Sequence, residues 1–273
     1  MDSTLLSIGP AAWLLLAVLL LTAGLVSALL LARSPWAVLA AGARAVLQLA
    51  VVALLISQLA GHPAAAAAFV LLMFSVASFT AGRRVTTGRR GLLMAVPIAA
   101  GVLPVLGLML ASGVLPLSAL ALIAVAGQLI GGAMTASTLA GRRLLGELQQ
   151  RSGEVEAALA LGFPDPEARM LILRPVAGEA LIPALDQTRT VGLVTLPGAF
   201  VGLILGGASP VDAALVQLLV LVALLAVEAL AIAVVLFGCT HGWWRPQAPA
   251  ARGSGAAERK THWLKRPARA SRA

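Results

Sequence analysis

Residues 211–238 read VDAALVQLLVLVALLAVEALAIAVVLFG, and this stretch decides the class of fold. It contains two charged residues, Asp212 close to its start and Glu228 in its interior. A helix needs roughly 20 predominantly apolar residues to cross the hydrocarbon core of a bilayer. The stretch exceeds that length, so the sequence predicts a transmembrane helix here.

Apolar stretches of this kind recur along the chain. Hydrophobic residues make up 60% of the 273 residues and charged residues only 11%, whereas soluble domains carry about 25% charged residues. We therefore expect an all-α, polytopic membrane protein with about seven transmembrane helices. The expected spans are residues 10–32, 37–60, 64–81, 92–112, 115–140, 188–207 and 211–238.

The basic residues indicate the orientation of these spans. All 20 Lys and Arg lie in or beside the first, third and fifth connections or in the C-terminal tail, and the other connections carry none. Basic residues close to membrane spans are retained on the cytoplasmic side. The pattern predicts an outside N-terminus and a cytoplasmic C-terminus. Residues 1–10 hold no Lys or Arg, so we expect no cleavable secretory signal there.

Two parts of different composition are predicted, a transmembrane domain over residues 1–240 and a basic cytoplasmic tail over residues 241–273. The tail holds eight Lys and Arg against one Glu and has little apolar periodicity, so it is expected to be disordered. Trp243 and Trp244 directly follow the last span, where indole rings commonly anchor a helix end at the membrane interface.

The fifth connection, residues 141–187, is long and mixed in charge, and it is predicted to contain two helices. Glu156 falls near the start of the first helix, where the helix dipole favours negative charge. Gly162 is expected to end that helix, and the FPDP sequence that follows prevents direct continuation. The second helix is expected to begin near Pro166, with proline in its first turn.

A spaced motif lies in this connection. Glu156-Ala157-Ala158 is followed after three residues by Gly162, and after nine more by the sequence ILRP at 172–175. This resembles the EAA loop of ABC-transporter permeases, E-A-A-x3-G-x9-I-x-L-P, with Arg174 in place of Leu. The alternative is an ordinary amphipathic loop helix in an Ala-rich chain. The resemblance implies that an ATPase is contacted by Glu156, Ala157, Ala158, Gly162, Asp165 and Glu167.

Further segments resemble the FetB-type family of ABC permeases. They are RAVLQL at 44–49, LALG at 159–162, LIPAL at 181–185, VGLVTLPG at 191–198 and GGASP at 206–210. One departure is Asp186, where the family pattern leads us to expect Asn. The family includes bacterial proteins assigned to iron export and plant relatives linked to aluminium tolerance.

The resemblance implies a transport subunit and not an enzyme, located in the bacterial cytoplasmic (inner) membrane and exporting iron or another metal. Two permease chains would pair with a separate ABC ATPase that binds ATP and Mg²⁺. The chain has no G-x-x-x-x-G-K-[ST] phosphate-binding motif, so ATP hydrolysis is expected on that other chain. We expect no cofactor on this chain, the lipid bilayer as its surroundings, and no nucleic-acid partner.

Polar side chains within the spans are candidates for a translocation path. Glu228 is either a cation or proton site or a hydrogen-bonded structural carboxyl. Gln48, Gln128 and Gln217 either line the same path or hold helices together. The single Cys239 and three scattered histidines provide no metal-ligand cluster.

Glycines at four-residue spacing are candidates for helix packing. Gly198, Gly202 and Gly206 share one face of the expected sixth span, where they would allow close approach within the bundle or at a dimer or gating interface. Two other classes of function remain open. One is an ion-gradient-driven secondary transporter or channel that uses Glu228, and the other is a membrane scaffold without cargo.

Overall fold

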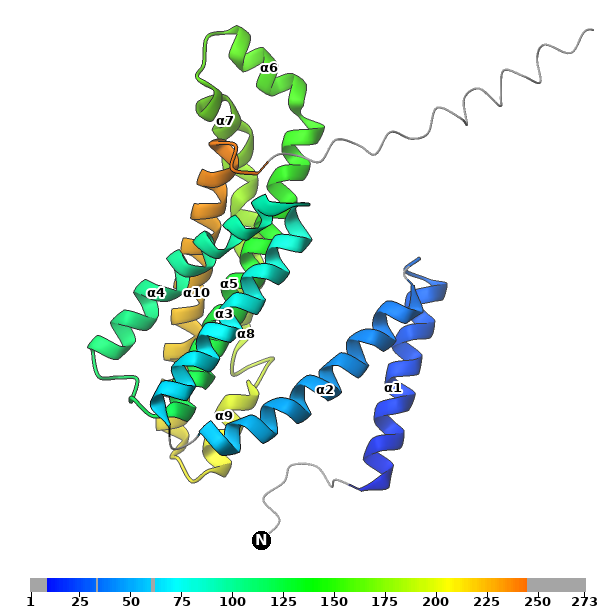
Figure 1. Cartoon of the computed structure of the whole chain (residues 1–273), viewed down its shortest axis with the longest axis vertical. Helices are drawn as coiled ribbons and strands as arrows, with labels where there is room; N and C mark the ends of the chain where they lie inside the picture. Colours follow the sequence, from blue (N-terminus) through cyan, green and yellow to red (C-terminus); the bar gives the residue numbers. More distant parts are fainter. Residues whose placement is uncertain (1–8, 33, 60–61, 245–273) are drawn as a thin grey trace, which may run out of the picture. The chain divides into compact units, whose positions relative to one another are not determined.

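The computed structural model describes residues 9–32, 34–59 and 62–244, which fold into helices joined by short turns (Figure 1). The all-α prediction is confirmed for these residues. The helices are α1 (Pro10–Leu29), α2 (Pro35–Leu59), α3 (Pro63–Val85), the 3-10 helix η1 (Arg89–Met94), α4 (Ala95–Ala111), α5 (Ala119–Gln150), α6 (Ser152–Ala160), α7 (Asp165–Ala177), the 3-10 helix η2 (Gly178–Leu181), α8 (Ile182–Thr190), α9 (Gly198–Leu205) and α10 (Pro210–Thr240). The predicted tail lies outside the described residues from 245 onward.

Within the described ranges, six helical segments are long and apolar enough to cross a membrane. They are α1, α2, α3, η1 together with α4, α5 and α10. Six of the seven predicted spans correspond to these segments. The prediction of a continuous span over 188–207, the sixth in chain order, is wrong, because α8 ends at Thr190 and α9 begins only at Gly198.

Glycine and proline explain the break between α8 and α9. The N–H groups of residues 193–195 all donate to the carbonyl of Thr190, at 3.3, 2.9 and 3.2 Å, so the chain turns tightly instead of continuing the helix. Gly192 adopts a φ of 85°, in the left-handed region that favours glycine. Pro197, which has no N–H to donate, is the N-cap of α9.

Helix α5 continues beyond its predicted end at residue 140, to Gln150. The prediction ended there because Arg142 and Arg143 mark the edge of the membrane. Charged residues can end a membrane span without ending a helix, and residues 141–150 contain no proline to interrupt one. The connection at 141–187 therefore begins within α5, and α6, α7, η2 and most of α8 lie in its remainder.

Contacts divide the chain into two compact units. Helices α3, α4, α5, α8 and α10 contribute residues to both. Unit 1 consists of Met1–Ser75, Val102–Gly131 and Ala184–Ala226, and unit 2 consists of Val76–Gly101, Gly132–Pro183 and Val227–Ala273.

In unit 1, α1 and α2 pack against each other as a helical hairpin (Figure 1). Their approach depends on Gly42, because a Cβ atom there would lie 2.6 Å from Cδ1 of Leu20. A separate cluster is centred on buried Ala66, Ala119 and Ile123 of α3 and α5. Small residues thus let helices come close in this unit, as is usual for helices packed in a membrane.

In unit 2, glycines allow backbone segments to touch. A Cβ atom at Gly82 would collide with the carbonyl oxygen of Gly91, so α3 and η1 are in direct backbone contact. A Cβ atom at Gly101 would lie 2.6 Å from the carbonyl oxygen of Val227. These positions can only be glycine without a shift of backbone, which fixes α3, η1, α4 and α10 within the unit.

The end of α10 differs from its predicted role. Trp244 is fully buried, and its indole N–H donates to the carbonyl of Arg90 at 3.1 Å. Gly238 provides the space, because a Cβ atom there would collide with the Trp244 ring. Trp244 therefore packs inside unit 2, and the prediction that it anchors the helix at the membrane interface is wrong. Trp243 is partly buried beside it.

Candidate functional site

Helix α6 presents the Glu156-Ala157-Ala158 motif on a surface. None of its nine residues is buried. Glu156 and Ala157 are exposed, and Ala158 is partly buried. An isolated helix of this length is marginal in water, so α6 depends on its neighbours to stay folded.

A bidentate ion pair lies at the junction between α5 and α6. Arg151 is the one residue between the two helices. Its Nε donates to Oε1 of Glu154 at 2.7 Å and its Nη2 to Oε2 at 2.6 Å. These hydrogen bonds lower the pKa of the Glu154 carboxyl. The pair closes the first turn of α6, where side-chain capping is otherwise lacking.

The turn after α6 is a Schellman motif. Gly162 has a φ of 91°, its N–H donates to the carbonyl of Leu159 at 2.9 Å, and the Phe163 N–H donates to the carbonyl of Ala158 at 3.1 Å. Pro164 then serves as N-cap of α7. The predicted helix end at Gly162 and the predicted start of a second helix close to Pro166 are both confirmed.

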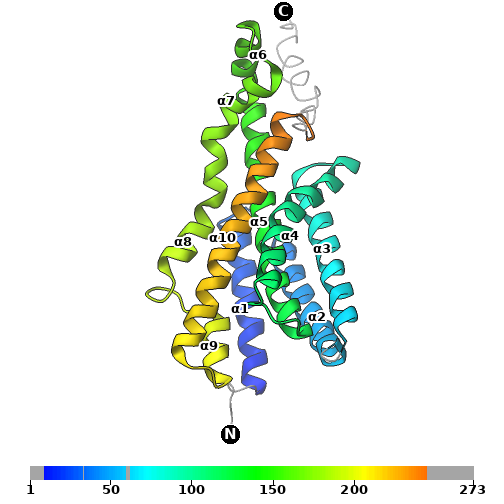
Figure 2. The same cartoon turned by 90° about the vertical axis from the view of Figure 1, so that its left-hand side faces the viewer.

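Helix α7 anchors this hairpin, defined here as residues 152–177. Its buried residues, Ala168, Ile172, Leu173 and Ala177, lie on one face. Its first turn carries a bidentate pair from Arg169 to Asp165, with nitrogen-to-oxygen distances of 2.9 and 2.7 Å. Helix α6 packs on α7, beyond the end of α5 (Figure 2). Helix α7 is therefore held in place by its buried face, whereas α6 lies on the surface.

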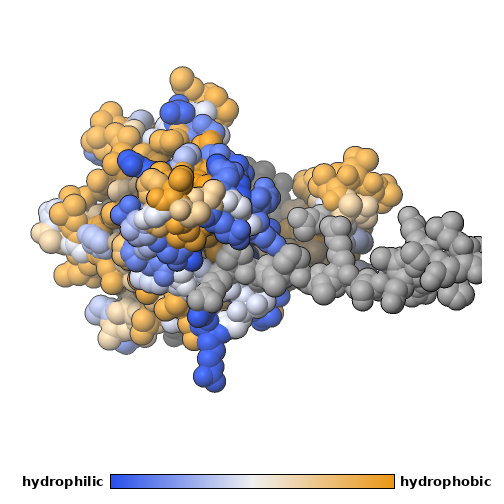
Figure 3. Space-filling model, turned by 90° about the horizontal axis from the view of Figure 1, so that it is seen from above, coloured by the Kyte–Doolittle hydropathy of each residue, from blue (hydrophilic) through white to orange (hydrophobic). Residues whose placement is uncertain are grey.

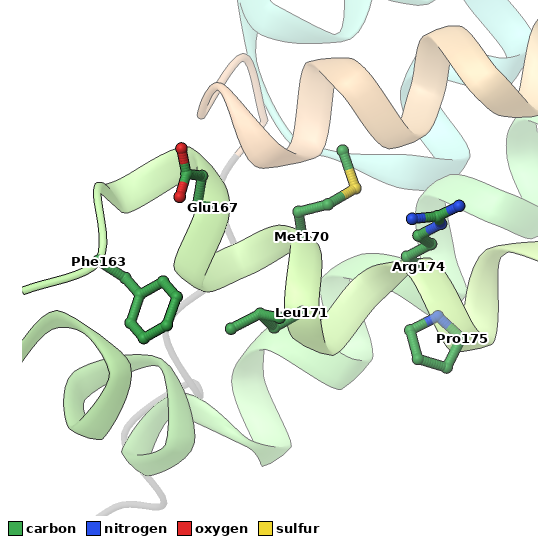
Figure 4. Close-up of a pocket in the computed structure, with 6 residues that line it drawn as sticks. All are labelled: Phe163, Glu167, Met170, Leu171, Arg174 and Pro175. Carbon is green, nitrogen blue, oxygen red and sulfur yellow. The ribbon is translucent and has the colours of Figure 1, made fainter. Parts of the chain in front are cut away.

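The opposite face of α7 lines a pocket of about 590 Å³ (Figure 4). Positions 167, 171 and 174 of this pocket are spaced as neighbours on one helix face. Phe163 and Leu171 make one end apolar, while Glu167 and Arg174 place opposite charges along it. The lining residues are Phe163, Glu167, Met170, Leu171, Arg174 and Pro175. Arg174, where the chain departs from the EAA pattern, thus contributes to the pocket.

Apolar side chains are also exposed around the turn of the hairpin. Leu159, Leu161 and Phe163 are exposed, Leu161 to 80%. Figure 3 looks onto this end and shows hydrophobic surface with hydrophilic surface around it. Apolar patches with a polar rim are typical of protein interaction sites.

A second pocket, of about 300 Å³, lies in unit 1 at the break between α8 and α9. Gln217 is its one polar side chain and is only 8% exposed. In the part of the chain that the structure describes, the Gln217 amide has no hydrogen-bond partner. The lining residues are Val191, Gly192, Leu196, Pro197, Phe200, Ala214, Gln217, Leu218 and Leu221.

The other candidate path residues are placed differently. Gln48 and Gln128 are exposed residues of unit 1, and Glu228 is a partly buried residue of unit 2. Across the described ranges, no hydrogen bond joins any two of these side chains or Gln217. Of the four, Gln217 lines the pocket at the break between α8 and α9.

The glycines predicted for helix packing face open space. A Cβ atom at Gly198 or Gly202 would meet no atom within 4 Å, and one at Gly206 would meet only carbonyl oxygens of its own helix. Close packing at these glycines stays a prediction. The glycines that do allow close approach, such as Gly82 and Gly101, show no regular spacing in sequence, because their partners lie on other elements.

Metal-ligating side chains do not cluster in the described residues. No group of three or more His, Cys, Asp or Glu among them could hold a metal ion.

Six apolar helices with an exposed hairpin before the last define the class as a multi-pass α-helical membrane protein. Comparison with known sequences gives the family. The chain belongs to the uncharacterised protein family UPF0014, whose profile matches residues 10–243. The resemblance to FetB-type proteins is thereby confirmed.

Three relatives illustrate the match. The chain is 38% identical to the UPF0014 membrane protein STAR2 of Oryza sativa subsp. japonica over 182 residues, which are 66% of this chain and 64% of that protein. It is 38% identical to the protein ALUMINUM SENSITIVE 3 of Arabidopsis thaliana over 152 residues, 55% and 56% of the two chains. It is 35% identical to the probable iron export permease protein FetB of Escherichia coli (strain K12) over 141 residues, 50% and 52%. The chain thus spans less than two thirds of these relatives. No solved structure matches it.

Proposed function

We propose that this chain is the permease subunit of an ABC transporter and that its α6–α7 hairpin attaches it to a separate ATPase. The observation that carries the proposal is α6, which displays Glu156-Ala157-Ala158 and buries none of its residues. Helix α7 holds it in place through its own buried face. A short helix displayed in this way is suited to lie in a groove of a partner protein.

The charges of the hairpin refine which side chains would meet the ATPase. Asp165 is already paired with Arg169. Glu167 and Arg174 belong to no ion pair within the described ranges, and both line the pocket next to Phe163. We therefore assign the rim contacts to Glu167 and Arg174 and a positioning role to Asp165. An apolar side chain of the ATPase would enter the pocket between them.

The junction between α5 and α6 provides a route for transmission. Helix α5 is continuous over 32 residues, and only Arg151 separates it from α6. The two hydrogen bonds from Arg151 to Glu154 stiffen this junction. A displacement of α6 by the ATPase would therefore move α5 and alter access to the path through the membrane.

The remaining partners follow from the same assignment. ATP and Mg²⁺ would bind the ATPase subunit, because this chain has no phosphate-binding motif of the P-loop type. Two permease chains would pair with two ATPase subunits in the bacterial cytoplasmic (inner) membrane. The distribution of Lys and Arg supports an outside N-terminus and a cytoplasmic hairpin.

For the cargo, we propose iron or another metal moved outward. The name of the Escherichia coli relative refers to iron export, and that of the Arabidopsis thaliana relative refers to aluminium. The break beside Gln217 supports a path there, because transporters place their binding sites at discontinuous helices. Gln48, Gln128 and Glu228 are the other residues assigned to this path.

Co-purification and reconstitution test the proposal. The chain would be co-expressed with an ABC ATPase encoded in the same genome, and ATP hydrolysis would be measured in vesicles with Fe²⁺, Mn²⁺, Zn²⁺ or Al³⁺. Glu156→Lys is expected to lower ATPase retention at least tenfold, whereas the control Glu147→Lys, with the same charge change on α5, retains it. Equal retention by both variants would refute the attachment site. Absence of stimulation by every metal would refute the cargo assignment alone.

One observation favours a second function, an ion-gradient-driven transporter or channel. Glu228 is a partly buried carboxyl inside the long apolar helix α10. Carboxyls at such positions commonly serve in proton or ion relays. If Glu156→Lys leaves transport intact while Glu228→Gln or a protonophore abolishes it, this second function replaces the first.

A further inference from the structure

A cationic pocket of about 530 Å³ lies in unit 2 between the end of α3 and the second half of α5. Positions 135, 138, 139 and 142 of α5 follow the spacing i, i+3, i+4, i+7, so they lie on one face of that helix. Arg84, in the last turn of α3, completes the pocket. The lining residues are Arg84, Thr135, Thr138, Leu139, Arg142 and Arg143. No part of the ATPase attachment site contributes to it.

The pocket carries positive charge that the protein itself does not neutralise. Arg143 forms an ion pair with Glu179. Arg84 and Arg142 belong to none of the ion pairs found in the described ranges. The Thr138 hydroxyl already donates to the carbonyl of Met134 at 2.7 Å. The guanidinium groups of Arg84 and Arg142 are therefore the donors left for an anion.

Helix lengths place these two arginines at the membrane surface. At 1.5 Å per residue, Arg84 lies about 32 Å along α3 from Pro63, and Arg142 lies about 35 Å along α5 from Ala119. The hydrocarbon core of a bilayer is about 30 Å thick. Both side chains thus reach the level of the lipid phosphates.

Polarity changes along the pocket as it does along a lipid. The arginines mark the end at the membrane surface, and Leu139 and the methyl groups of Thr135 and Thr138 lie toward the hydrocarbon core. A phospholipid has the same order, with its phosphate at the surface and its acyl chains below. Free phosphate would match the arginines but leave the apolar part of the pocket empty.

We propose that this pocket binds the phosphate headgroup of an anionic phospholipid. Guanidinium groups pair with phosphate through two parallel hydrogen bonds, and basic pockets between transmembrane helices recognise anionic headgroups. A zwitterionic headgroup would bring its own positive charge toward the arginines. The pocket therefore selects phosphatidylglycerol over phosphatidylcholine.

Native mass spectrometry of the full chain tests this selection. The purified chain in detergent would be exposed to equal amounts of phosphatidylglycerol and phosphatidylcholine, and the bound lipid counted. The double variant Arg84→Gln/Arg142→Gln is expected to lose retention of phosphatidylglycerol about thirtyfold. Arg90→Gln, an exposed arginine outside the pocket, serves as the matched control and is expected to retain the lipid.

Three further arms decide the outcome. Arg142→Lys preserves the positive charge and should retain most of the bound phosphatidylglycerol. This variant distinguishes loss of charge from loss of the fold as the cause of weaker lipid binding. Inorganic phosphate at millimolar concentration should not displace phosphatidylglycerol, and displacement would show a free-anion site instead. Equal retention of the two lipids by the natural chain, or unchanged retention by the double variant with its thermal unfolding intact, would overturn the proposal.

Discussion

The turn between α6 and α7 and the turn between α8 and α9 have nearly the same chemistry in opposite surroundings. Each contains a left-handed glycine, Gly162 with φ 91° and Gly192 with φ 85°. In each, a proline caps the following helix, Pro164 at φ −61°, ψ 148° and Pro197 at φ −61°, ψ 140°. The local backbone rules are therefore the same for both turns.

The two turns differ in the polarity of the residues around them. The first turn is followed directly by the ion pair of Asp165 with Arg169 at the start of α7. The second is preceded by the ion pair of Asp186 with Arg189 in α8, but the turn itself is largely apolar, and Leu193 and Val194 are 94% and 77% exposed. Water can satisfy an irregular backbone, but lipid cannot, so an apolar turn of this kind needs cover if it lies in the membrane. The comparison teaches that the second turn requires cover by protein or an aqueous path, which agrees with its proposed place beside the translocation route.

The largest effect is expected from a pair of leucines. Leu173→Ala removes a fully buried side chain that anchors α7 and should lower the free energy of unfolding by about 2–5 kcal/mol. Leu193→Ala at the second turn should change it by less than about 0.5 kcal/mol. Unfolding of the purified chain in detergent, followed by circular dichroism, measures both. Equal losses would mean that the second turn is already covered within the chain, and the comparison would fail.

Alanine substitutions test the shared backbone conformation. Gly162→Ala and Gly192→Ala should each destabilise the chain by about 1–2 kcal/mol, because alanine is strained at positive φ. The control Gly146→Ala lies within helix α5 with open space around it and should stabilise by about 0.5–1 kcal/mol. Opposite signs in the same unfolding assay are the expected outcome. If only one of the two substitutions left the stability unchanged, the two turns would not share the same backbone constraint.

The amide of Gln217, beside the second turn, is expected to lower stability and to support transport. Gln217→Leu removes a buried polar group without a partner and is expected to raise the free energy of unfolding by about 1 kcal/mol. The same variant should lower transport in vesicles if Gln217 contacts the cargo. The exposed Gln128→Leu provides the control. A loss of stability in Gln217→Leu would contradict the absence of a partner.

The smallest effect is expected from the ion pair of Arg151 with Glu154, at the start of the helix that precedes the first turn. Hydrogen bonds from Arg151 depress the pKa of Glu154 below its ordinary value of 4.5. The pair therefore stabilises the fold fully above pH 4.5 and loses this contribution as the pH falls through the lower, folded-state pKa. Comparing the melting temperatures of the natural chain and Glu154→Gln from pH 7 to pH 3 should show a small difference that disappears in acid. A difference that persists at pH 3 would rule out the carboxylate as its source.

The same comparison explains what could be predicted from the sequence. The end of α6 at Gly162 and the start of α7 were predictable, because glycine and proline stand among charged residues. At residues 191–197, glycine and proline stand among leucines and valines. The average hydropathy of this segment therefore stays high and does not indicate that the helix breaks here. For α5, Arg142 is interpreted as marking the edge of the membrane, but it says nothing about where the helix ends.

Other features depend on contacts between distant segments. Trp244 was predicted at an interface because of its place after a span, yet its position is decided by Gly238 and by the carbonyl of Arg90. The pocket at α7 needed the fold of the turn to bring Phe163 beside it. Of the candidate path residues, Gln217 lines the pocket at the second turn, and this placement depends on the tertiary fold and not on residue type.

The burial of Trp244 gives the protein an intrinsic optical probe. Among the tryptophans that the structure describes, Trp13 and Trp36 are 63% and 76% exposed, whereas Trp244 is fully enclosed. Its fluorescence should lie at shorter wavelength and resist aqueous quenchers as long as α10 and η1 stay together. Replacing the other tryptophans with phenylalanine would leave a single emitter, whose spectrum would report the separation of these two helices as it happens.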